Sequence, residues 1–248
     1  MQIPWTQEQW KVMMTLIMTH LSNGMCVALQ APFYPAEAEK KGASATSYGL
    51  VFGIFELTVF LVSPFMGKYL PRLGVRRAFN GGITITGLMF IAFGFLDRVR
   101  GDDTFIALSL ANRIVAGVGN SAFLSASFTL VAQVFPSSVS TIFGLVEMAF
   151  GLGMILGPTV GGALYQLGGF EVPFAVLGGI LLFQAAISTL ILPTIKTNPA
   201  DTCQASDLGA MQAFKIPSLV LAIFSVFSAS MSVGALQVST RFMFNLNY

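Results

Sequence analysis

Long apolar runs with at most one charged residue constrain this chain more than any other feature. Seven such runs are long enough to cross a bilayer core, which takes about 20 helical residues. Only 10% of the residues are charged, against about 25% in a soluble domain. The sequence therefore predicts an all-α membrane protein with spans at Val12–Phe33, Ser47–Gly67, Phe79–Leu96, Phe105–Phe135, Ile142–Leu167, Val172–Leu192 and Ser218–Val238.

The composition argues against several classes of function. One histidine and two cysteines supply no metal-ligand cluster and no nucleophile–base set, so we expect neither an enzyme nor a metal site. Cys26 in a span and Cys203 in a loop form no disulfide framework. No basic patch suits nucleic acid.

Basic residues indicate the orientation of the chain in the membrane. The 67–79 segment holds four Lys or Arg residues and no acid, whereas each neighbouring loop holds two basic residues beside acids. Cytoplasmic loops carry the excess of Lys and Arg. We therefore expect this segment, the N-terminus and the 193–217 stretch to be cytoplasmic.

A weak internal repeat groups the spans into threes. The spacing of Gly67, Gly74 and Phe79 recurs one three-span group later, at Gly162, Gly169 and Phe174. Three crossings invert the topology, and inverted three-span repeats are typical of transporters with a binding site near the midplane. The repeat supports an inverted 3+3 arrangement.

Four ionisable side chains lie inside the predicted spans, namely His20, Glu56, Arg113 and Glu147. A charge at the bilayer centre costs about 2.5–3.5 kcal/mol, so such residues are functional candidates. We expect the spans that carry them (one, two, four and five) to line a wet cavity, and spans three and six to face lipid.

Each of these residues has an alternative reading. Glu56 and Arg113, at equal depth, could neutralise each other, and His20 could be a hydrogen-bonded interior residue instead of a proton relay. Glu147 could be a structural tether. However, two acids against one arginine leave a surplus negative charge, which suits a cationic substrate exchanged for protons.

The stretch GLVEMAFGLGMILGPTVGG, residues 144–162, is unusually rich in glycine. Gly153, Gly157 and Gly161 recur every fourth residue and would form a smooth stripe for close helix packing in lipid. Pro158 is tolerated in a membrane helix and is expected to kink it. The stripe is for packing, and the nearby Glu147 is for cargo or protons.

Two motifs resemble the major facilitator superfamily in the helices that would line its pathway. RIVAGVG, with Arg113 and Gly117, is similar to the fourth helix of that family, and GLGMILGPTVGG is similar to its antiporter motif in the fifth helix.

The basic segment after the second span resembles the family's loop motif at Gly67, Arg72, Gly74 and Arg76. Pro71 stands where the family usually has Asp, which puts the gating salt bridge of that Asp in doubt. The stretches FELTVFLVSPFMGKYL, FGFLDRV and GPTVGGALYQLGGFEVPFAVLGG look most like the vesicular amine transporters, and among these the polyamine-carrying branch.

This resemblance implies a domain organisation. Residues 1–192 would form the N-terminal six-helix bundle, 193–217 the cytoplasmic linker between halves, and 218–248 the first helix of an incomplete C-terminal half. We therefore expect a fragment or a truncated isoform whose partner is the missing C-terminal half or a full-length protomer.

The resemblance also implies a function. It predicts a proton-coupled antiporter of organic cations or polyamines in a secretory-vesicle membrane, with the proton as coupling ion and no cofactor. The first span lacks the carboxylate of the monoamine- and acetylcholine-carrying relatives, which disfavours those substrates. Two alternatives stay open. One is a non-transporting truncated partner of a full-length transporter. The other, less favoured, is a seven-span receptor, whose N-terminus should lie outside the cell, whereas the N-terminus of this chain is expected to be cytoplasmic.

Overall fold

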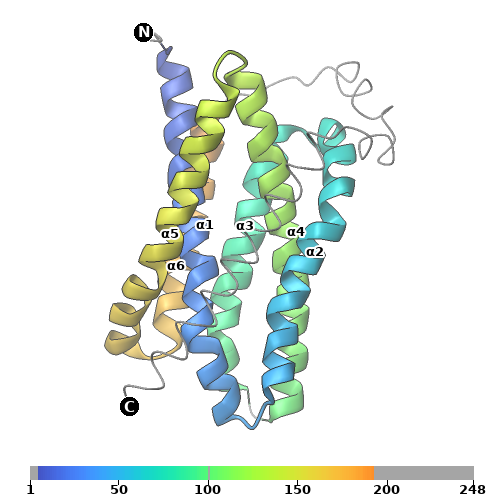
Figure 1. Ribbon diagram of the computed structural model, residues 1–248, viewed down its shortest axis with the longest axis vertical. Coiled ribbons are helices and arrows are strands. Elements are labelled where there is room, and N and C mark those ends of the chain that lie inside the picture. The colour runs from blue at the N-terminus through green and yellow to red at the C-terminus, as the bar shows by residue number, and fades with distance from the viewer. Residues whose placement is uncertain (1–4, 100, 193–248) are drawn as a thin grey trace. The chain divides into compact units, whose positions relative to one another are not determined.

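The computed structural model describes residues 5–99 and 101–192, which contain six long helices (Figure 1). All six are long and apolar enough to span a membrane. They are α1 (Gln7–Lys40), α2 (Ala45–Leu73), α3 (Val75–Gly94), α4 (Asp102–Val134), α5 (Val139–Gly168) and α6 (Glu171–Ile191), with a 3₁₀ turn η1 (Phe95–Arg98) after α3. The predicted linker and the predicted seventh span lie outside the described residues.

The first helix is longer at both ends than its apolar core. Thr6 and Gln9 form a capping box, in which each side chain accepts a hydrogen bond from the other residue's backbone N–H. Further along, the helix continues through Pro32 and Pro35 and ends only at Lys40, as neighbouring groups in a membrane protein permit. Hydropathy alone therefore locates this span but not its ends.

Close pairs of helices build the bundle. α1 lies beside α5, α2 packs on α4, and α3 packs on both α4 and α6 (Figure 1). In an inverted 3+3 repeat, α1 corresponds to α4, α2 to α5 and α3 to α6. Under this correspondence the α1–α5 contact is equivalent to the α4–α2 contact. This pairing is the one that an inverted 3+3 repeat would produce.

The same repeat relates the α3–α4 contact to the α6–α1 contact, but these two contacts differ in how closely the helices pack. α3 and α4 meet closely at Gly82, where an added Cβ atom would lie 2.5 Å from the backbone nitrogen of Phe123. The corresponding α6–α1 contact is looser and leaves a groove of about 630 Å³, lined on α1 by Trp10, Met14 and Met18. The two halves of the bundle are therefore not packed alike.

The sequence predicts that the third span faces lipid. Helix α3 instead packs partly in the core. It lies between α4 and α6, and its buried residues include Phe79, Phe90 and Phe93. The expectation rested on the absence of charge from this span, but an uncharged helix can also pack in the core. The least buried helices are instead α2 and α5.

Candidate functional site

The four ionisable candidates divide into two buried and two exposed side chains. His20 on α1 and Arg113 on α4 are buried inside the bundle. Glu56 on α2 and Glu147 on α5 are exposed on the two least buried helices. The structure thus brings these residues to different environments, not to one cavity.

His20 joins α1 to α4. Its Nε2 atom lies 2.7 Å from the Oγ atom of Ser127, and its ring centroid lies 4.8 Å from that of Phe123. A serine hydroxyl can donate to or accept from a ring nitrogen, so this contact is compatible with either tautomer of His20. His20 therefore occupies the position of a hydrogen-bonded interior histidine.

Arg113 is surrounded by aromatic rings. Its guanidinium carbon lies 4.3 Å from the ring centroid of Phe93, 5.5 Å from that of Phe55 and 5.9 Å from that of Phe52. Cations are attracted to ring faces at such distances. Within the described residues, the Nε and Nη2 atoms of Arg113 have no hydrogen-bond partner.

No ion pair joins Arg113 to Glu56 in the described part of the chain, although the two residues lie at matching depth. Each lies about 16 Å along its helix from the end at which α2 and α4 begin. Gly117 explains the separation, because α2 meets α4 there through Phe55 and Thr58. Glu56 follows Phe55 in the sequence, so its side chain leaves α2 in a direction about 100° further around the helix axis, where it is exposed.

A small cavity of about 20 Å³ borders Arg113 inside the bundle. Such a volume holds a single water molecule. Its polar lining comes from α1, α3 and α4, and none of the lining residues is acidic. The lining is Asn23, Cys26, Val27, Gln30, Phe55, Thr86, Phe90, Phe93, Asn112, Arg113 and Ala116.

Glu147 lies on the exposed side of α5, about 12 Å from the start of that helix at Val139. None of the described residues forms an ion pair or a side-chain hydrogen bond with it. Glu56 is exposed as well, but it interacts with the charge of Arg113 from a distance. Among the described residues, no group of three metal-ligating side chains is present.

The glycine stripe of α5 faces α1. A Cβ atom added at Gly153 would lie 2.1 Å from the carbonyl oxygen of Leu21, and one added at Gly157 would lie 2.7 Å from that of Met25. Gly161 instead faces the side chain of Leu29. The two backbones are thus in direct contact at Gly153 and Gly157, and helix α5 continues through the exposed Pro158.

The basic turn between α2 and α3 depends on one glycine. Gly74 has a φ of +83°, a left-handed conformation that glycine adopts without strain, and this residue alone separates the two helices. Gly67, in contrast, has open space around it. Arg76 donates to the backbone oxygen of Thr189 on α6, and Arg72 lies over the ring of Tyr69.

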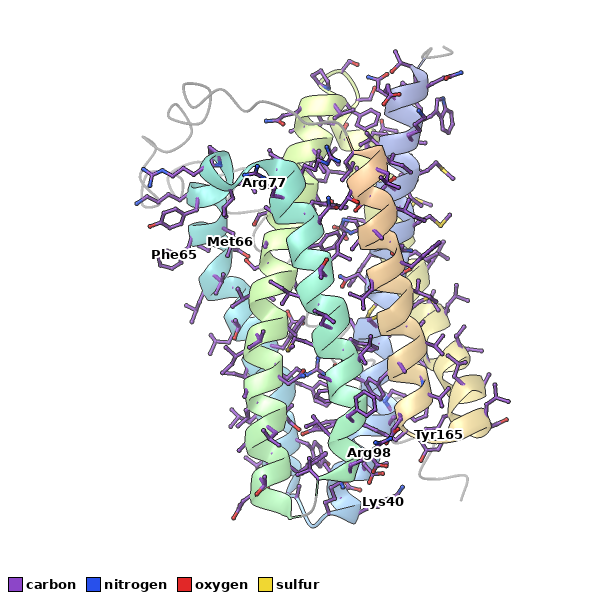
Figure 2. The ribbon with its side chains drawn as sticks, turned by 180° about the vertical axis from the view of Figure 1, so that it is seen from behind. Lys40, Phe65, Met66, Arg77, Arg98 and Tyr165 are labelled. Carbon is purple, nitrogen blue, oxygen red and sulfur yellow. The ribbon has the colours of Figure 1, made fainter. Side chains whose placement is uncertain are left out.

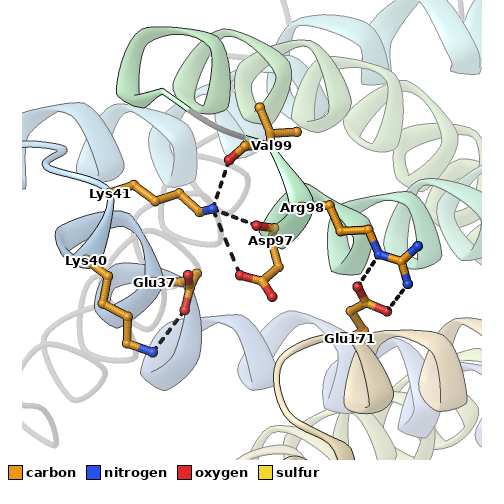
Figure 3. A network of polar contacts seen from close by, with 7 residues as sticks. All are labelled: Glu37, Lys40, Lys41, Asp97, Arg98, Val99 and Glu171. Atoms are coloured by element: carbon orange, nitrogen blue, oxygen red, sulfur yellow. Dashed lines mark hydrogen bonds and ion pairs between the residues drawn. The ribbon is translucent and has the colours of Figure 1, made fainter.

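Figure 2 shows Arg77 of this basic turn at one end of the bundle, and Lys40 and Arg98 at the other. At that second end, Lys41 joins three elements (Figure 3). Its Nζ atom donates to the backbone oxygens of Asp97, at 2.6 Å, and Val99, at 2.9 Å, and lies 5.2 Å from the ring centroid of Phe105.

Two ion pairs lie beside Lys41 in this network. Arg98 donates to both carboxylate oxygens of Glu171, at 2.5 and 2.7 Å, and so ties η1 to α6, while Lys40 pairs with Glu37 at 3.1 Å (Figure 3). This network was not predicted from the sequence, although the charged clusters at the ends of the first and third spans are a visible signal.

The comparisons with known proteins relate most of the chain to one family. The model of the Major Facilitator Superfamily matches residues 16–247. The MFS-type transporter SLC18B1 of Homo sapiens is 41% identical over 196 residues, covering 79% of this chain and 43% of that protein. Its counterpart in Rattus norvegicus is 37% identical, covering 93% of this chain and 50% of that protein. The Synaptic vesicular amine transporter of Homo sapiens is 25% identical, covering 76% of this chain and 35% of that protein.

Solved structures agree on the fold alone. The peptide transporter POT in complex with sulfate has a TM-score of 0.53 at 20% identity, covering 87% of this chain and 45% of that one. Tetrameric PepTSo2 has a TM-score of 0.52 at 18% identity, covering 93% of this chain and 48% of that one. The chain thus spans half or less of the length of the relatives it matches.

Proposed function

Because this chain belongs to the Major Facilitator Superfamily, we propose that the complete protein is a secondary transporter that exchanges organic cations, and polyamines in particular, for protons. The superfamily comprises transporters, so neither an enzyme nor a seven-span receptor fits the family match. The name of the vesicular amine transporter relative supports an amine as the substrate class.

The two exposed acids carry this proposal. Glu56 and Glu147 lie within membrane-spanning helices, on faces that no other described helix covers. A carboxylate exposed to hydrocarbon is costly, so such residues normally face the protein interior or a water-filled cavity. We therefore assign these faces of α2 and α5 to the transport pathway.

Two carboxylates on separate helices suit a polyamine, whose ammonium groups are spaced along an extended chain. One ammonium would meet Glu147 and another Glu56. The buried residues His20 and Arg113 would not contact this substrate directly, since both lie inside the bundle.

Exchange follows from the charge of such a site. A carboxylate can be neutralised by a proton or by an ammonium group, and binding of either one displaces the other. Both neutralised states are inexpensive to move past apolar surroundings, whereas the bare anion is costly there. A site that changes its access only when neutralised would couple amine movement to proton movement in the opposite direction.

The location and the partner are part of the same proposal. The basic turn at Lys68–Arg77 favours a cytoplasmic N-terminus, and an acidic vesicle lumen would then supply the protons. The relatives are about twice as long as this chain, so we assign the second wall of the pathway to a C-terminal half or to a full-length protomer.

The test uses the complete protein in proteoliposomes with an acidic interior, and follows spermine and a neutral solute in parallel. Glu147→Gln mimics the protonated acid permanently, so spermine uptake driven by the pH gradient should be lost while insertion stays normal. Glu8→Gln is the matched control, because Glu8 is an exposed acid paired with Lys11 at the start of α1.

Two results would count against the proposal. Wild-type spermine uptake by the Glu147→Gln variant would remove Glu147 from the mechanism. Uptake by the wild-type protein that does not respond to the pH gradient would reject proton exchange itself.

A further inference from the structure

We propose that the cavity beside Arg113 is a binding site for a small inorganic anion of the chloride class, held inside the six-helix bundle. The proposal is independent of the transported substrate, since it concerns an enclosed site among α1, α2, α3 and α4.

The first observation is the state of Arg113. The rings of Phe93, Phe55 and Phe52 lie around its guanidinium group, and such contacts stabilise a cation through the faces of the rings. Ring faces do not accept hydrogen bonds in the plane of the guanidinium, so its N–H groups need other acceptors. Two of these donors, on Nε and Nη2, are buried with no partner in the described residues.

The second observation is the lining of the cavity. The hydroxyl oxygen of Thr86 is also buried without a partner among the described residues, and Asn23 and Gln30 bring further amide donors from α1. Asn112 already donates through Nδ2 to the backbone oxygen of Met89, at 2.9 Å. The cavity is thus bordered by one cation and neutral polar groups, with no carboxylate.

The size of the cavity limits its occupant. About 20 Å³ accepts one water molecule or a monatomic ion of similar size. An amine chain, a phosphate or a carboxylate side chain from another segment is too large for it.

Charge distinguishes the two occupants that fit. A water molecule could bridge the unpaired donors, but it would leave the guanidinium without a counter-charge in direct contact. A buried charge requires both a counter-charge and hydrogen bonds. A chloride ion supplies both, and hydrogen bonds between charged groups are roughly twice as strong as neutral ones. Glu56 on α2 interacts with the charge of Arg113 from a distance, but it is exposed, forms no ion pair with Arg113 among the described residues and does not line the cavity.

The experiment titrates the full chain in lipid nanodiscs with chloride against a gluconate background, and follows the chlorine NMR linewidth. Wild-type protein should give a saturable broadening that bromide displaces. Arg113→Gln should abolish the saturable component. Thr86→Val keeps the side-chain shape but removes one donor, so it should weaken binding about tenfold or more.

Two further variants serve as controls. Lys11→Gln removes an exposed cation and should leave chloride binding unchanged. If Arg113→Gln fails to insert, Arg113→Lys, which retains the charge but not the planar donor fork, should bind chloride more weakly than wild type.

Three outcomes would overturn the proposal. Absence of saturable broadening would mean that the cavity holds water. Equal broadening in wild type and in both Arg113→Gln and Thr86→Val would mean that chloride binds elsewhere. Saturable binding that appears only in Glu56→Gln would identify Glu56 as the counter-charge of Arg113.

Discussion

Polar side chains inside the bundle are stabilised in different ways. His20 has a hydrogen-bond partner on the next helix, while Arg113 relies on aromatic rings for the face of its guanidinium. Each arrangement has a different weak point. For His20 the weak point is a single hydroxyl group.

Ser127→Ala should therefore destabilise the bundle. The substitution leaves one buried nitrogen of His20 without a partner, which costs about 1–3 kcal/mol. Thermal unfolding of the chain in detergent measures this loss. Ser137→Ala is the control, since Ser137 is exposed. An equal effect of the two substitutions would mean that the Ser127 contact contributes nothing specific.

The sequence could identify these residues but not their surroundings. A charge within an apolar run is conspicuous, so His20, Glu56, Arg113 and Glu147 were all predicted as candidates. Hydropathy gives the depth of a residue but not the direction in which it faces, which depends on the packing of neighbouring helices. The rings around Arg113 could not be predicted, because the chain has 23 phenylalanines and most spans contain several.

At the scale of the element, glycines decide how closely helices approach. Gly153 on α5 and Gly24 on α1 each leave no room for a Cβ atom, since the opposing carbonyl oxygens would lie 2.1 and 2.3 Å away. Gly151 and Gly144 belong to the same helix as Gly153 but have open space around them. The sequence pattern predicted the stripe, and the structure separates its members from the other glycines of the helix.

This difference gives a prediction within one helix. Gly153→Ala should force α1 and α5 apart and cost about 1–3 kcal/mol. Gly151→Ala should be neutral or stabilise the chain by up to about 1 kcal/mol through helix propensity. The measurement is the midpoint of denaturant unfolding for both variants. Similar midpoints would show that the close α1–α5 contact does not determine stability.

The two glycines of the basic motif should also respond differently. Gly74→Ala places a side chain at a φ of +83° and a ψ of 130°, a sparsely populated region in which an L-residue is strained by roughly 1–3 kcal/mol. Gly67→Ala meets open space inside α2 and, like Gly151→Ala, should be neutral or stabilise the chain by up to about 1 kcal/mol. Comparing the two thermal midpoints tests this assignment. A larger loss at Gly67 would contradict it and would indicate a close contact there.

Helix ends were predicted less well than helix positions. The six predicted spans within the described residues all coincide with helices, but α1 extends from Gln7 to Lys40 instead of Val12–Phe33. Its extra turns contain polar residues, which hydropathy scores as loop. They are stabilised by the Thr6 capping box and by the Lys40–Glu37 pair, and both are local interactions.

At the scale of the whole molecule, the exposed faces of α2 and α5 are the feature that packing alone does not explain. They combine large apolar side chains, such as Phe60 and Ile155, with the acids Glu56 and Glu147. A face directed to lipid would carry the apolar groups without the acids. Our proposal that a second half completes the pathway accounts for both kinds of residue.

The proposal also requires a particular orientation in the membrane, which is the last prediction. Lys68, Arg72 and Arg77 lie at the α2–α3 end of the bundle, and Glu39 lies at the end marked by Lys40 in Figure 2. In a chain whose two cysteines are replaced, single cysteines at Lys68 and Arg77 should react with an impermeant maleimide from the cytoplasmic side. Cysteines at Glu39 and Asp103 should react only from the opposite side.

The physical reason is the excess of positive charge in the α2–α3 turn, which resists translocation across the membrane. Cysteine at Leu16, which is buried, is the control and should stay unlabelled in intact vesicles from both sides. Labelling of the cysteine at position 68 from the lumen would show that the topology is the reverse of the one predicted. Protons from an acidic lumen would then enter at the opposite end of the bundle, so the vesicular form of the proposed exchange would have to be abandoned even if amine transport itself were observed.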